Sequence, residues 1–496
     1  MKSIVFRQRF VMGALLIFFI IASCSFGQNA KNVILMIGDG FGFNTDIAGT
    51  YWRYGQANAQ TYHKFPKHLG VMTFSISKED YSPDKAQGYN PETIWKNPDG
   101  QLEGTEYTRI TDSAAAATAL NSGQKTKNSQ LGIDFNGQPL KLYSEYAQEA
   151  GRSIGIVTTT NFVDATPAAV VAHQSSRGDF LAICQEQLNN QNVKVLFGAG
   201  HPEYKRGAVE LETDPELDYK YVGGQETWEK IVKNDGYLNL TFFDDLASFE
   251  KLASETPDLV AQNKLELPER VLGVARTKSI IFAVDGASDE KGMEAVRQHC
   301  HPSLFGSVPT LSTMSIAALN VLSQNQNGFY LMIESALIDH TNHSRNIAGT
   351  VIEHTGFSKA IDAVCDWVEK YSSWDETLVI ITADHETGQL WGPETYFDAD
   401  ENGKFSLKKE DVFKQFNPVV NNGQSVLPSV QYGGSGHSLG LVPLWAKGAG
   451  VDYVDSLIRL NDPKAGEFWN FSGNVIDNTD IFNLMLHASG FDNEGK

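Results

Sequence analysis

Ser113 stands where a serine hydroxyl could act as a nucleophile. In the stretch ITDSAAAATALNSGQKT (110–126), Asp112 and Ser113 precede a run of alanines that closes at Gly123. Asp or Ser can cap a helix, alanine propagates it at little entropic cost, and glycine often ends it. The same helix start would hold the Ser113 hydroxyl where backbone N–H groups and the helix dipole favour an anion. Taken alone the stretch favours a plain helix cap, so the choice depends on the rest of the chain.

Carboxylate, imidazole and hydroxyl side chains that could bind metals recur close to the ends of apolar runs. Asp339 and His343 are four residues apart, so on a helix they would share a face and could hold one ion. Carboxylates mixed with imidazoles suit Zn²⁺, whereas a Thr hydroxyl beside carboxylates suits the harder Mg²⁺. A single Asp or His is usually plain surface, but several of them beside a candidate nucleophile and an arginine indicate a metal centre. The candidates are Asp39, Asp164, Thr166, Arg177, Glu334, Asp339, His340, His343, Asp384, His385 and His437.

The elements that must position these residues are predicted from continuous apolar runs separated by amphipathic stretches. Continuous apolar character favours strands buried on both faces, as in a parallel sheet covered by helices. The alternation of strands and helices predicts an α/β fold, with three αβα layers around a doubly wound, mostly parallel central sheet. In such a sheet functional residues gather just past the carboxyl ends of the strands, so the candidates should converge. The predicted strands are 32–38, 153–160, 193–200, 329–335, 377–384 and 441–448, and the clearest helices are 139–151 and 354–371.

Residues 28–496 are interpreted as a single domain that carries insertions. Residues 78–105 are polar and turn-rich, 201–275 are acidic with mixed periodicity, and 391–435 are rich in Gly, Asn, Pro and Ser. Within the last of these, Asp398, Asp400 and Asn402 resemble the start of a calcium loop. No Glu follows at the twelfth position of that loop, so a surface turn is favoured over a weak Ca²⁺ site.

Residues 1–27 have the pattern of a secretory signal. A basic start with Lys2, Arg7 and Arg9 is followed by an apolar run over 10–22 and then by small residues. Two processing routes stay open. The stretch IASC (21–24) resembles a bacterial lipobox, which would leave Cys24 acylated and the protein tethered to a membrane, whereas small residues also permit cleavage before Gln28. The pattern predicts a periplasmic or secreted protein under either route.

The overall charge and the cysteines exclude other classes of protein. Forty basic against 60 acidic residues give a net charge of −20, so a nucleic-acid-binding role has no electrostatic basis. An anionic substrate would need local cations to overcome this charge, and bound metals would supply them. Cys184, Cys300 and Cys365 lie far apart without CxxC spacing, which favours buried free thiols and leaves room for one pair at most.

Several motifs taken together resemble the alkaline phosphatase family. They are GDGFG (38–42), TDSAAAATA (111–119), DATPAAVVAHQSSR (164–177), the spacing E-x4-D-x3-H from Glu334, ADHETG (383–388) and a distal GHS (436–438) before VPLWA. The resemblance spans the core from residue 32 to DNTDIFNLM (477–485) in the family's order. GDG or DH alone would be weak evidence, whereas the combination is highly specific.

The resemblance implies a role for each matched residue. Ser113 corresponds to the nucleophile that becomes phosphorylated, Arg177 to the guanidinium that grips two phosphate oxygens, and Asp112 to the carboxylate that orients it. The implied metal ligands are Asp339, His343 and His437 for one zinc, Asp39, Asp384 and His385 for a second zinc, and Asp39, Thr166 and Glu334 for a magnesium ion. Asp164 and His340 stand at positions where the family varies, near magnesium and phosphate, and both are candidates for substrate binding. His340 could bridge to phosphate through water or simply pack beside Asp339. His173 is interpreted as structural.

We therefore expect a metal-dependent phosphomonoesterase that acts on small phosphate monoesters through a phosphoserine intermediate. The family resemblance also implies a homodimer. A phosphodiesterase or sulfatase on the same metal core is the alternative, which Arg177 and the third metal set disfavour. A metal- or phosphate-binding surface lipoprotein without catalysis is less favoured, because no catalytic position is missing.

Overall fold

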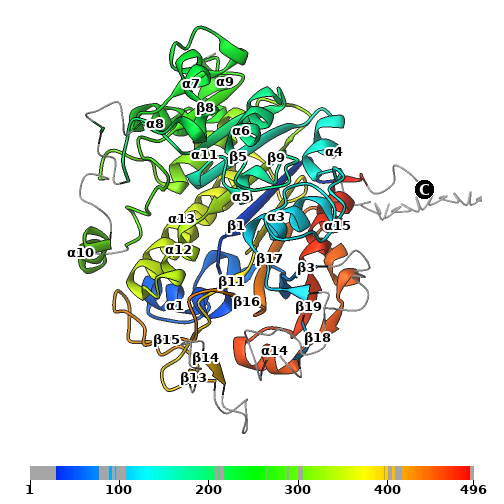
Figure 1. The fold of residues 1–496 in the computed structure, drawn as a ribbon, viewed down its shortest axis with the longest axis vertical. Coiled ribbons are helices and arrows are strands. Elements are labelled where there is room, and N and C mark those ends of the chain that lie inside the picture. The colour runs from blue at the N-terminus through cyan, green and yellow to red at the C-terminus, as the bar shows by residue number, and fades with distance from the viewer. Residues whose placement is uncertain are drawn as a thin grey trace, which may run out of the picture.

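A large twisted sheet forms the centre of the molecule in the computed structural model (Figure 1). The structure describes residues 29–77, 89–91, 95, 108–206, 210–211, 217–263, 265–287, 290–299, 305–395, 397–399, 405–407 and 416–491. The strand order of the sheet is β18-β19-β2-β17-β10-β1-β9-β5-β6-β8-β7. From β10 to β7 all neighbouring strands are parallel, whereas β17 runs antiparallel to both of its neighbours. The predicted mostly parallel α/β fold is confirmed.

The strands of the sheet include every strand predicted from the sequence. Those at its centre are buried along their whole length, because helices cover both faces and water reaches neither. The bounds of the predicted strands are β1 (Asn32–Gly38), β5 (Ser153–Asn161), β6 (Val193–Ala199), β9 (Phe329–Ser335), β10 (Thr377–Thr382) and β17 (Val442–Gly448). The remaining strands are β2 (Lys67–Met72), β7 (Thr241–Phe243), β8 (Val271–Val274), β18 (Leu460–Asn461) and β19 (Asn474–Asp477). Residues 201–275, interpreted from the sequence as an insertion, thus contribute β7 and β8 to one edge of the main sheet.

Helices cover the two faces of the sheet in separate groups (Figure 1). One group contains α1 (Phe43–Tyr54), α8 (Leu246–Ser254), α11 (Leu311–Leu322) and α13 (Ile347–Tyr371), and the other contains α3 (Ser113–Ser122), α4 (Tyr143–Glu149) and α15 (Asn478–Ser489). The predicted helices 139–151 and 354–371 correspond to α4 and α13. The other helices are α5 (Ala165–Ala168), α6 (Phe180–Asn189), α7 (Gln225–Val232), α9 (Pro257–Asn263), α10 (Glu290–His299), α12 (Leu337–His343) and α14 (Pro463–Trp469). Among the described residues, no helix combines the length and apolar character that crossing a membrane requires.

Several sequence predictions concern residues outside the described ranges or at their borders. The signal segment, Cys24, Cys300, Asp400 and Asn402 lie outside the described residues. Asp398 belongs to β13 (Phe397–Ala399), which pairs with β14 (Phe405–Leu407) as a hairpin. Cys184 and Cys365 are buried free thiols, as predicted, and burial raises the pKa of the Cys365 thiol to about 12.

A buried carboxylate joins α1 to α13 beside the sheet. The hydroxyl of Tyr62 donates to Asp46 Oδ1 over 2.6 Å, while His63 Nε2 lies 2.8 Å from Oδ2 and His354 Nε2 lies 3.3 Å from Oδ1. Gly49 makes room for this contact, because a Cβ there would lie 2.0 Å from His354 Nδ1. Burial alone would raise the pKa of Asp46, but the two histidines outweigh it and hold that pKa far below its usual range.

Replacing this carboxylate should therefore destabilise the protein in a pH-dependent way. At pH 7 we expect Asp46→Asn to lower the free energy of unfolding by about 3 kcal/mol, because the buried donors around Asp46 would lose a charged acceptor. The folded-state pKa is lower than the unfolded one, so the unfolded chain binds more protons and the advantage of Asp46 is lost as pH falls. The stabilisation by Asp46 is complete above the pKa of about 4 in the unfolded chain and decreases as the pH falls below that value.

Urea denaturation of both proteins between pH 3 and 8 measures this difference. The control is Asp452→Asn, which removes an exposed partner of Lys67 and should change little at any pH. If Asp46→Asn destabilised the protein equally at every pH down to 3, the ionised form of Asp46 would not be what stabilises the fold.

Candidate functional site

The candidate residues converge because the strands that carry them are neighbours. The sheet order β10-β1-β9-β5 places the carboxyl ends of these parallel strands side by side. Asp39 follows β1, Glu334 is near the end of β9, and Asp384 with His385 follows β10. Asp164 and Thr166 lie after β5, where Asp164 caps the short helix α5. The structure thus brings residues that are far apart in the sequence to one edge of the sheet.

Ser113 is the first residue of α3, and its hydroxyl points to these carboxyl ends of the strands. The preceding Asp112 caps the helix by accepting from the N–H of Ala115 over 3.0 Å. Gly123 ends the helix in the left-handed conformation, with φ of 69°, as its place after the alanines predicts. Ser113 Oγ lies 3.3 Å from Nε2 of His385. The nucleophile candidate therefore contacts one of the metal-ligand candidates directly.

A first group of possible ligands consists of Asp39, Asp384 and His385. Their nearest ligand atoms lie within 4.8 Å of one another, and all three residues are buried. His385 Nε2 is 3.2 Å from Asp384 Oδ2 and 3.5 Å from Asp39 Oδ1, and both of these oxygens are inaccessible and have no hydrogen-bond partner. Burial and the neighbouring carboxylates raise the pKa of Asp384 to about 7 and that of Asp39 well above its usual range. A cation between these oxygens would remove the repulsion, so the residues fit a metal ion.

A second group surrounds Asp339 on α12. Oδ2 of Asp339 lies 3.1 Å from Nε2 of His343, and His437 Nε2 lies 3.6 Å from Oδ1. The Nδ1 atoms of His343 and His437 lie 2.5 Å from Ser435 O and 2.8 Å from Thr111 O. Because a carbonyl can only accept, both Nδ1 atoms carry a proton, and each Nε2 atom is left to bind either a second proton or a metal ion.

These two Nε2 atoms face each other at 3.2 Å. Two lone pairs at this distance repel unless a cation lies near them, which can be a proton or a metal ion. The hydrogen bond from His343 to Asp339 raises the pKa of His343 to about 9, so this position favours a cation. Two oriented imidazoles and one carboxylate are a donor set that zinc accepts.

A third group offers oxygen ligands only. Glu334 is buried on β9 and accepts a short hydrogen bond from the hydroxyl of Thr158. Burial raises its pKa to about 8 despite that bond. The hydroxyl of Thr166 is buried without a hydrogen bond of ordinary geometry, although it lies close enough to Glu334 to lower that pKa. Carboxylates with an unsatisfied hydroxyl suit a hard cation such as Mg²⁺.

Arg177 is held beside Ser113 by two carboxylates. Its Nη1 lies 3.3 Å from Asp112 Oδ2, and its Nη2 lies 3.1 Å from Asp164 Oδ1. About a third of the side chain is exposed, at 32%. The guanidinium is therefore fixed in direction but still accessible, as a group that receives an anion must be.

Two histidines of the sequence analysis take different places. His340 is half-buried on α12 and makes no side-chain hydrogen bond or ion pair with any other described residue. His173 lies 2.9 Å from the carbonyl of Leu140 through Nε2, and hydrogen bonding to Glu186 raises its pKa. These contacts belong to the packing of the loop after α5.

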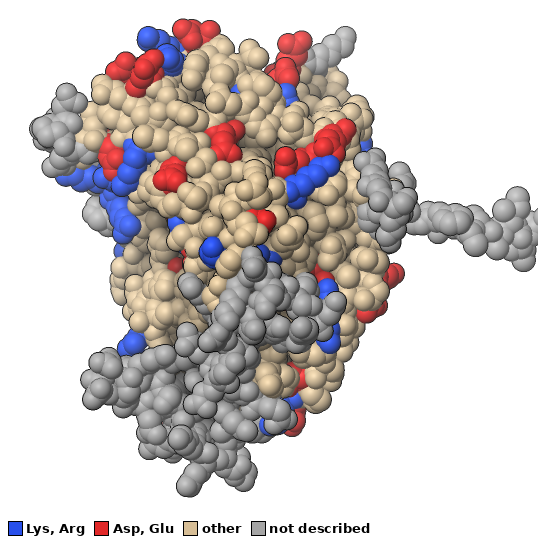
Figure 2. Space-filling model, turned by 45° about the vertical axis from the view of Figure 1, so that its right-hand side comes forward, with Lys and Arg blue, Asp and Glu red and all other residues tan. Residues whose placement is uncertain are grey.

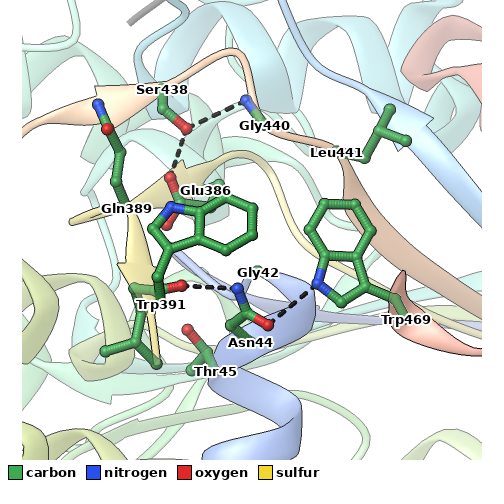
Figure 3. Close-up of a pocket in the computed structure, with 11 residues that line it drawn as sticks. Gly42, Asn44, Thr45, Glu386, Gln389, Trp391, Ser438, Gly440, Leu441 and Trp469 are labelled. Atoms are coloured by element: carbon green, nitrogen blue, oxygen red, sulfur yellow. Dashed lines mark hydrogen bonds between the residues drawn. The ribbon is translucent and has the colours of Figure 1, made fainter. Parts of the chain in front are cut away.

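A small cavity lies behind the strand pair that follows His385 and contains His437. In the ribbon of β11 (Glu386–Thr387) and β16 (His437–Ser438), Glu386 pairs with Ser438 and Thr387 with His437. Alternation along the strands turns Glu386 and Ser438 away from the metal-ligand candidates, and their side chains are hydrogen-bonded (Figure 3). The cavity behind them, of about 30 Å³, also touches Asn44, Trp391 and Trp469. This volume suits about one water molecule, so the cavity is too small to receive a phosphate ester.

Sequence reasoning missed the side chains that hold the ligand candidates. Thr158 binds Glu334, and Thr387 binds Asp339 over 2.6 Å. The period of two could have indicated Thr387, which is two residues after His385 in an extended segment. The carbonyls of Thr111 and Ser435 carry no signal in the sequence, because any residue type supplies one.

Comparison with known proteins identifies relatives over most of the chain. Residues 30–430 match the family model described as alkaline phosphatase. The alkaline phosphatase of Escherichia coli strain K12 is 30% identical over 385 residues, which are 74% of this chain and 72% of that protein. Among solved structures, Thermus thermophilus alkaline phosphatase superposes with a TM-score of 0.60 at 19% identity, covering 94% of this chain and 92% of that one. A mutant of TAB5 alkaline phosphatase with Mg bound in its M3 site superposes with a TM-score of 0.56 at 22% identity, covering 93% and 99%.

The clustered carboxylates predict that divalent metal stabilises the folded chain. We expect zinc and magnesium at about 1,000 times their dissociation constants to raise the free energy of unfolding by about 4 kcal/mol over the chelator-treated protein. The measurement is denaturant unfolding with chelator and with metal.

The variant Asp384→Asn distinguishes metal binding at this cluster from a general effect of metal ions on stability. It removes one repelling charge but keeps an oxygen for the N–H groups of Gly40 and His385. In the presence of chelator, the free energy of unfolding of Asp384→Asn should be at least as large as that of the parent. Added metal should raise it less than it raises that of the parent. A parent protein whose unfolding did not respond to either metal would show that the cluster holds no ion.

Proposed function

This chain belongs to the alkaline phosphatase family and is a phosphoric monoester hydrolase, and from that premise we propose how it acts. Ser113 is the nucleophile, small phosphate monoesters are the substrates, and the site holds two zinc ions and one magnesium ion. The single observation that carries this proposal is the close approach of His343 Nε2 and His437 Nε2, which lie 3.2 Å apart beside the carboxylate of Asp339.

We assign the ligand candidates to three sets from the resemblance to the family, while in the structure a ligand atom of His385 also lies within 4.8 Å of those of Asp339 and His437. Asp339, His343 and His437 would hold one zinc ion, Asp39, Asp384 and His385 the other, and Asp39, Thr166 and Glu334 the magnesium ion. The buried, unpartnered oxygens of Asp39, Asp384 and Thr166 support these assignments. The TAB5 alkaline phosphatase mutant with magnesium bound in its M3 site supports a metal-dependent enzyme as well. When bound, the ions would supply positive charge to the attacking and leaving oxygens and to the phosphoryl group.

The chain's own residues position the reaction. The Ser113 oxygen attacks phosphorus, so that a P–O bond to serine forms while the P–O bond to the leaving alcohol breaks. Arg177 grips two of the remaining phosphate oxygens with its fork of N–H groups, because Asp112 and Asp164 fix its plane. Water then cleaves the phosphoserine, releasing inorganic phosphate and restoring the Ser113 hydroxyl.

The site favours a monoester over a diester or a sulfate ester. A terminal phosphate offers three non-bridging oxygens, which together could engage Arg177 and the proposed metals. A diester or a sulfate ester carries less negative charge to balance the cations that the carboxylate clusters call for. A purely binding role is disfavoured as well, because Ser113 is poised 3.3 Å from His385.

The proposal also covers where the enzyme is located and what it associates with. The signal-like residues 1–27 support export to the periplasm or the outside, with a lipid anchor at Cys24 as one of two processing routes. A homodimer is proposed from family resemblance. Lys and Arg side chains on the face in Figure 2 stand near Asp and Glu side chains and form no continuous basic surface among the described residues there. This arrangement and the net charge of −20 argue against nucleic acid as a partner.

The nucleophile is tested by removing its hydroxyl. We expect Ser113→Ala to lower kcat for an aryl phosphate monoester by at least about 1,000-fold, because the residues of the site act as a unit. The parent should hydrolyse that monoester faster than the matching diester or sulfate. The zinc and magnesium content of the variant, measured by elemental analysis, should equal that of the parent.

Ser122→Ala is the matched control. Ser122 is a buried serine at the other end of α3, whose hydroxyl donates to the carbonyl of Thr118, and its loss should leave turnover unchanged. Unchanged hydrolysis in Ser113→Ala would overturn the proposed mechanism, and faster diester hydrolysis by the parent would overturn the substrate class.

A further inference from the structure

We propose that Thr387 is a positioning residue that ties the two proposed zinc sites together. Its single hydroxyl contacts a ligand of each site, lying 2.6 Å from Asp339 Oδ1 and 3.2 Å from His385 Nδ1. The inference rests on the proposed function, because it concerns residues assigned there to the metals. Thr387 lies within the ADHETG motif (383–388), but none of the proposed ligand sets includes it.

Two neighbours, His385 and His437, place Thr387 between the two sites. It follows His385 by two residues, so both side chains face the same side of the extended segment. It pairs across the ribbon with His437, a proposed ligand of the first zinc. The rings of His385 and His437 stack with centroids 3.5 Å apart, so these three side chains form one packed unit.

The approach of α12 to the ribbon depends on Gly40. Gly40 has φ of +70°, and a Cβ there would lie 2.7 Å from Asp339 Cα and 2.9 Å from the Thr387 hydroxyl. Because no side chain intervenes, Asp339 reaches the threonine directly. Thr387 is fully buried, so water cannot replace its hydrogen bonds.

The direction of the hydrogen bonds follows from the distances and the chemistry. A hydroxyl has one proton, and the 2.6 Å contact with the Asp339 carboxylate is the shorter and charge-assisted one, so the proton points to Asp339. The Thr387 oxygen is then left as an acceptor for His385 Nδ1–H at 3.2 Å.

This arrangement decides the tautomer of His385. With the proton on Nδ1, the lone pair of Nε2 points toward Ser113 Oγ and the oxygens of Asp39 and Asp384. A zinc ligand must present such a lone pair. The opposite tautomer would make Thr387 donate to Nδ1 and would leave Asp339 Oδ1 without its donor. One hydroxyl therefore prepares His385 for one zinc and orients Asp339 for the other.

The test compares Thr387→Val, which keeps the shape and removes the hydroxyl, with Thr387→Ser, which keeps the hydroxyl. Each purified protein is stripped of metal and titrated with Zn²⁺ against a chelator of known affinity. We expect Thr387→Val to bind zinc about 10- to 100-fold more weakly, the usual effect of losing a partner of a metal ligand. Thr387→Ser should bind nearly as tightly as the parent.

Co²⁺ substitution gives a second readout that a purely structural role would not move. The visible spectrum of bound Co²⁺ depends on coordination geometry, so it should change in Thr387→Val and be restored in Thr387→Ser. The matched control is Thr377→Val, which removes a buried, hydrogen-bonded hydroxyl at the far end of β10. It should alter stability without altering zinc affinity or the spectrum. If Thr387→Val does not fold, Thr387→Ala is titrated instead.

The possible outcomes separate this inference from the proposed function. A parent protein that bound no zinc would overturn both. A parent that bound zinc, with Thr387→Val binding it equally tightly and with the same Co²⁺ spectrum, would overturn only the role of Thr387. Weaker binding in both Thr387→Val and Thr377→Val would also overturn it, because general destabilisation would then explain the effect.

Discussion

Repulsion between buried carboxylates is the constraint to which the rest of this structure responds. Asp39, Glu334, Asp339 and Asp384 lie at or just beyond the carboxyl ends of β1, β9 and β10, where little water reaches them. Burial and mutual repulsion raise the pKa of Asp39, Glu334 and Asp384, whereas the pKa of Asp339 is lowered by its histidine neighbours. Such a cluster is costly in an apolar interior unless cations occupy it. The proposed zinc and magnesium ions answer that requirement, and they also give a chain with a net charge of −20 a local attraction for phosphate.

The surrounding fold supplies rigidity for this arrangement. Parallel strands buried on both faces fix the backbone of Asp39, Glu334 and Asp384, while the cap at Asp112 fixes the start of α3. Hydroxyls and carbonyls then orient the ligand side chains one by one, as Thr158 does for Glu334 and Thr111 does for His437. A site built on strands with fixed partners needs little rearrangement when charge develops in the reaction.

Much of the fold was predictable because its signals are local. Continuous apolar runs predicted the central strands, including β1 and β9 with their observed bounds. The alanine run with Gly123 likewise predicted α3. The edge strand β7 and its neighbour β8 were missed, because short strands in an acidic segment of mixed periodicity carry little pattern. Their place is decided by pairing with β6 and with each other.

In the site, too, local signals were predictable and long-range contacts were not. Positions at strand ends indicated the ligand candidates, and the resemblance to a family assigned their roles. The contacts among them were not predictable, because the ribbon of β11 and β16 joins residues about fifty positions apart. Thr387 becomes significant only once that ribbon brings it to Asp339. Asp112 could be predicted as a cap or as a partner of Arg177, and in the structure it is both.

The central claim is that phosphate passes through Ser113 at a metal-loaded site. The most direct measurement is an acid quench of the protein during turnover of a phosphate monoester, followed by mass spectrometry of its peptides. The account predicts a phosphate on the peptide that contains Ser113, present with zinc and magnesium and absent after chelation. Rapid turnover with no phosphate on Ser113, or with phosphate on a different residue, would contradict it.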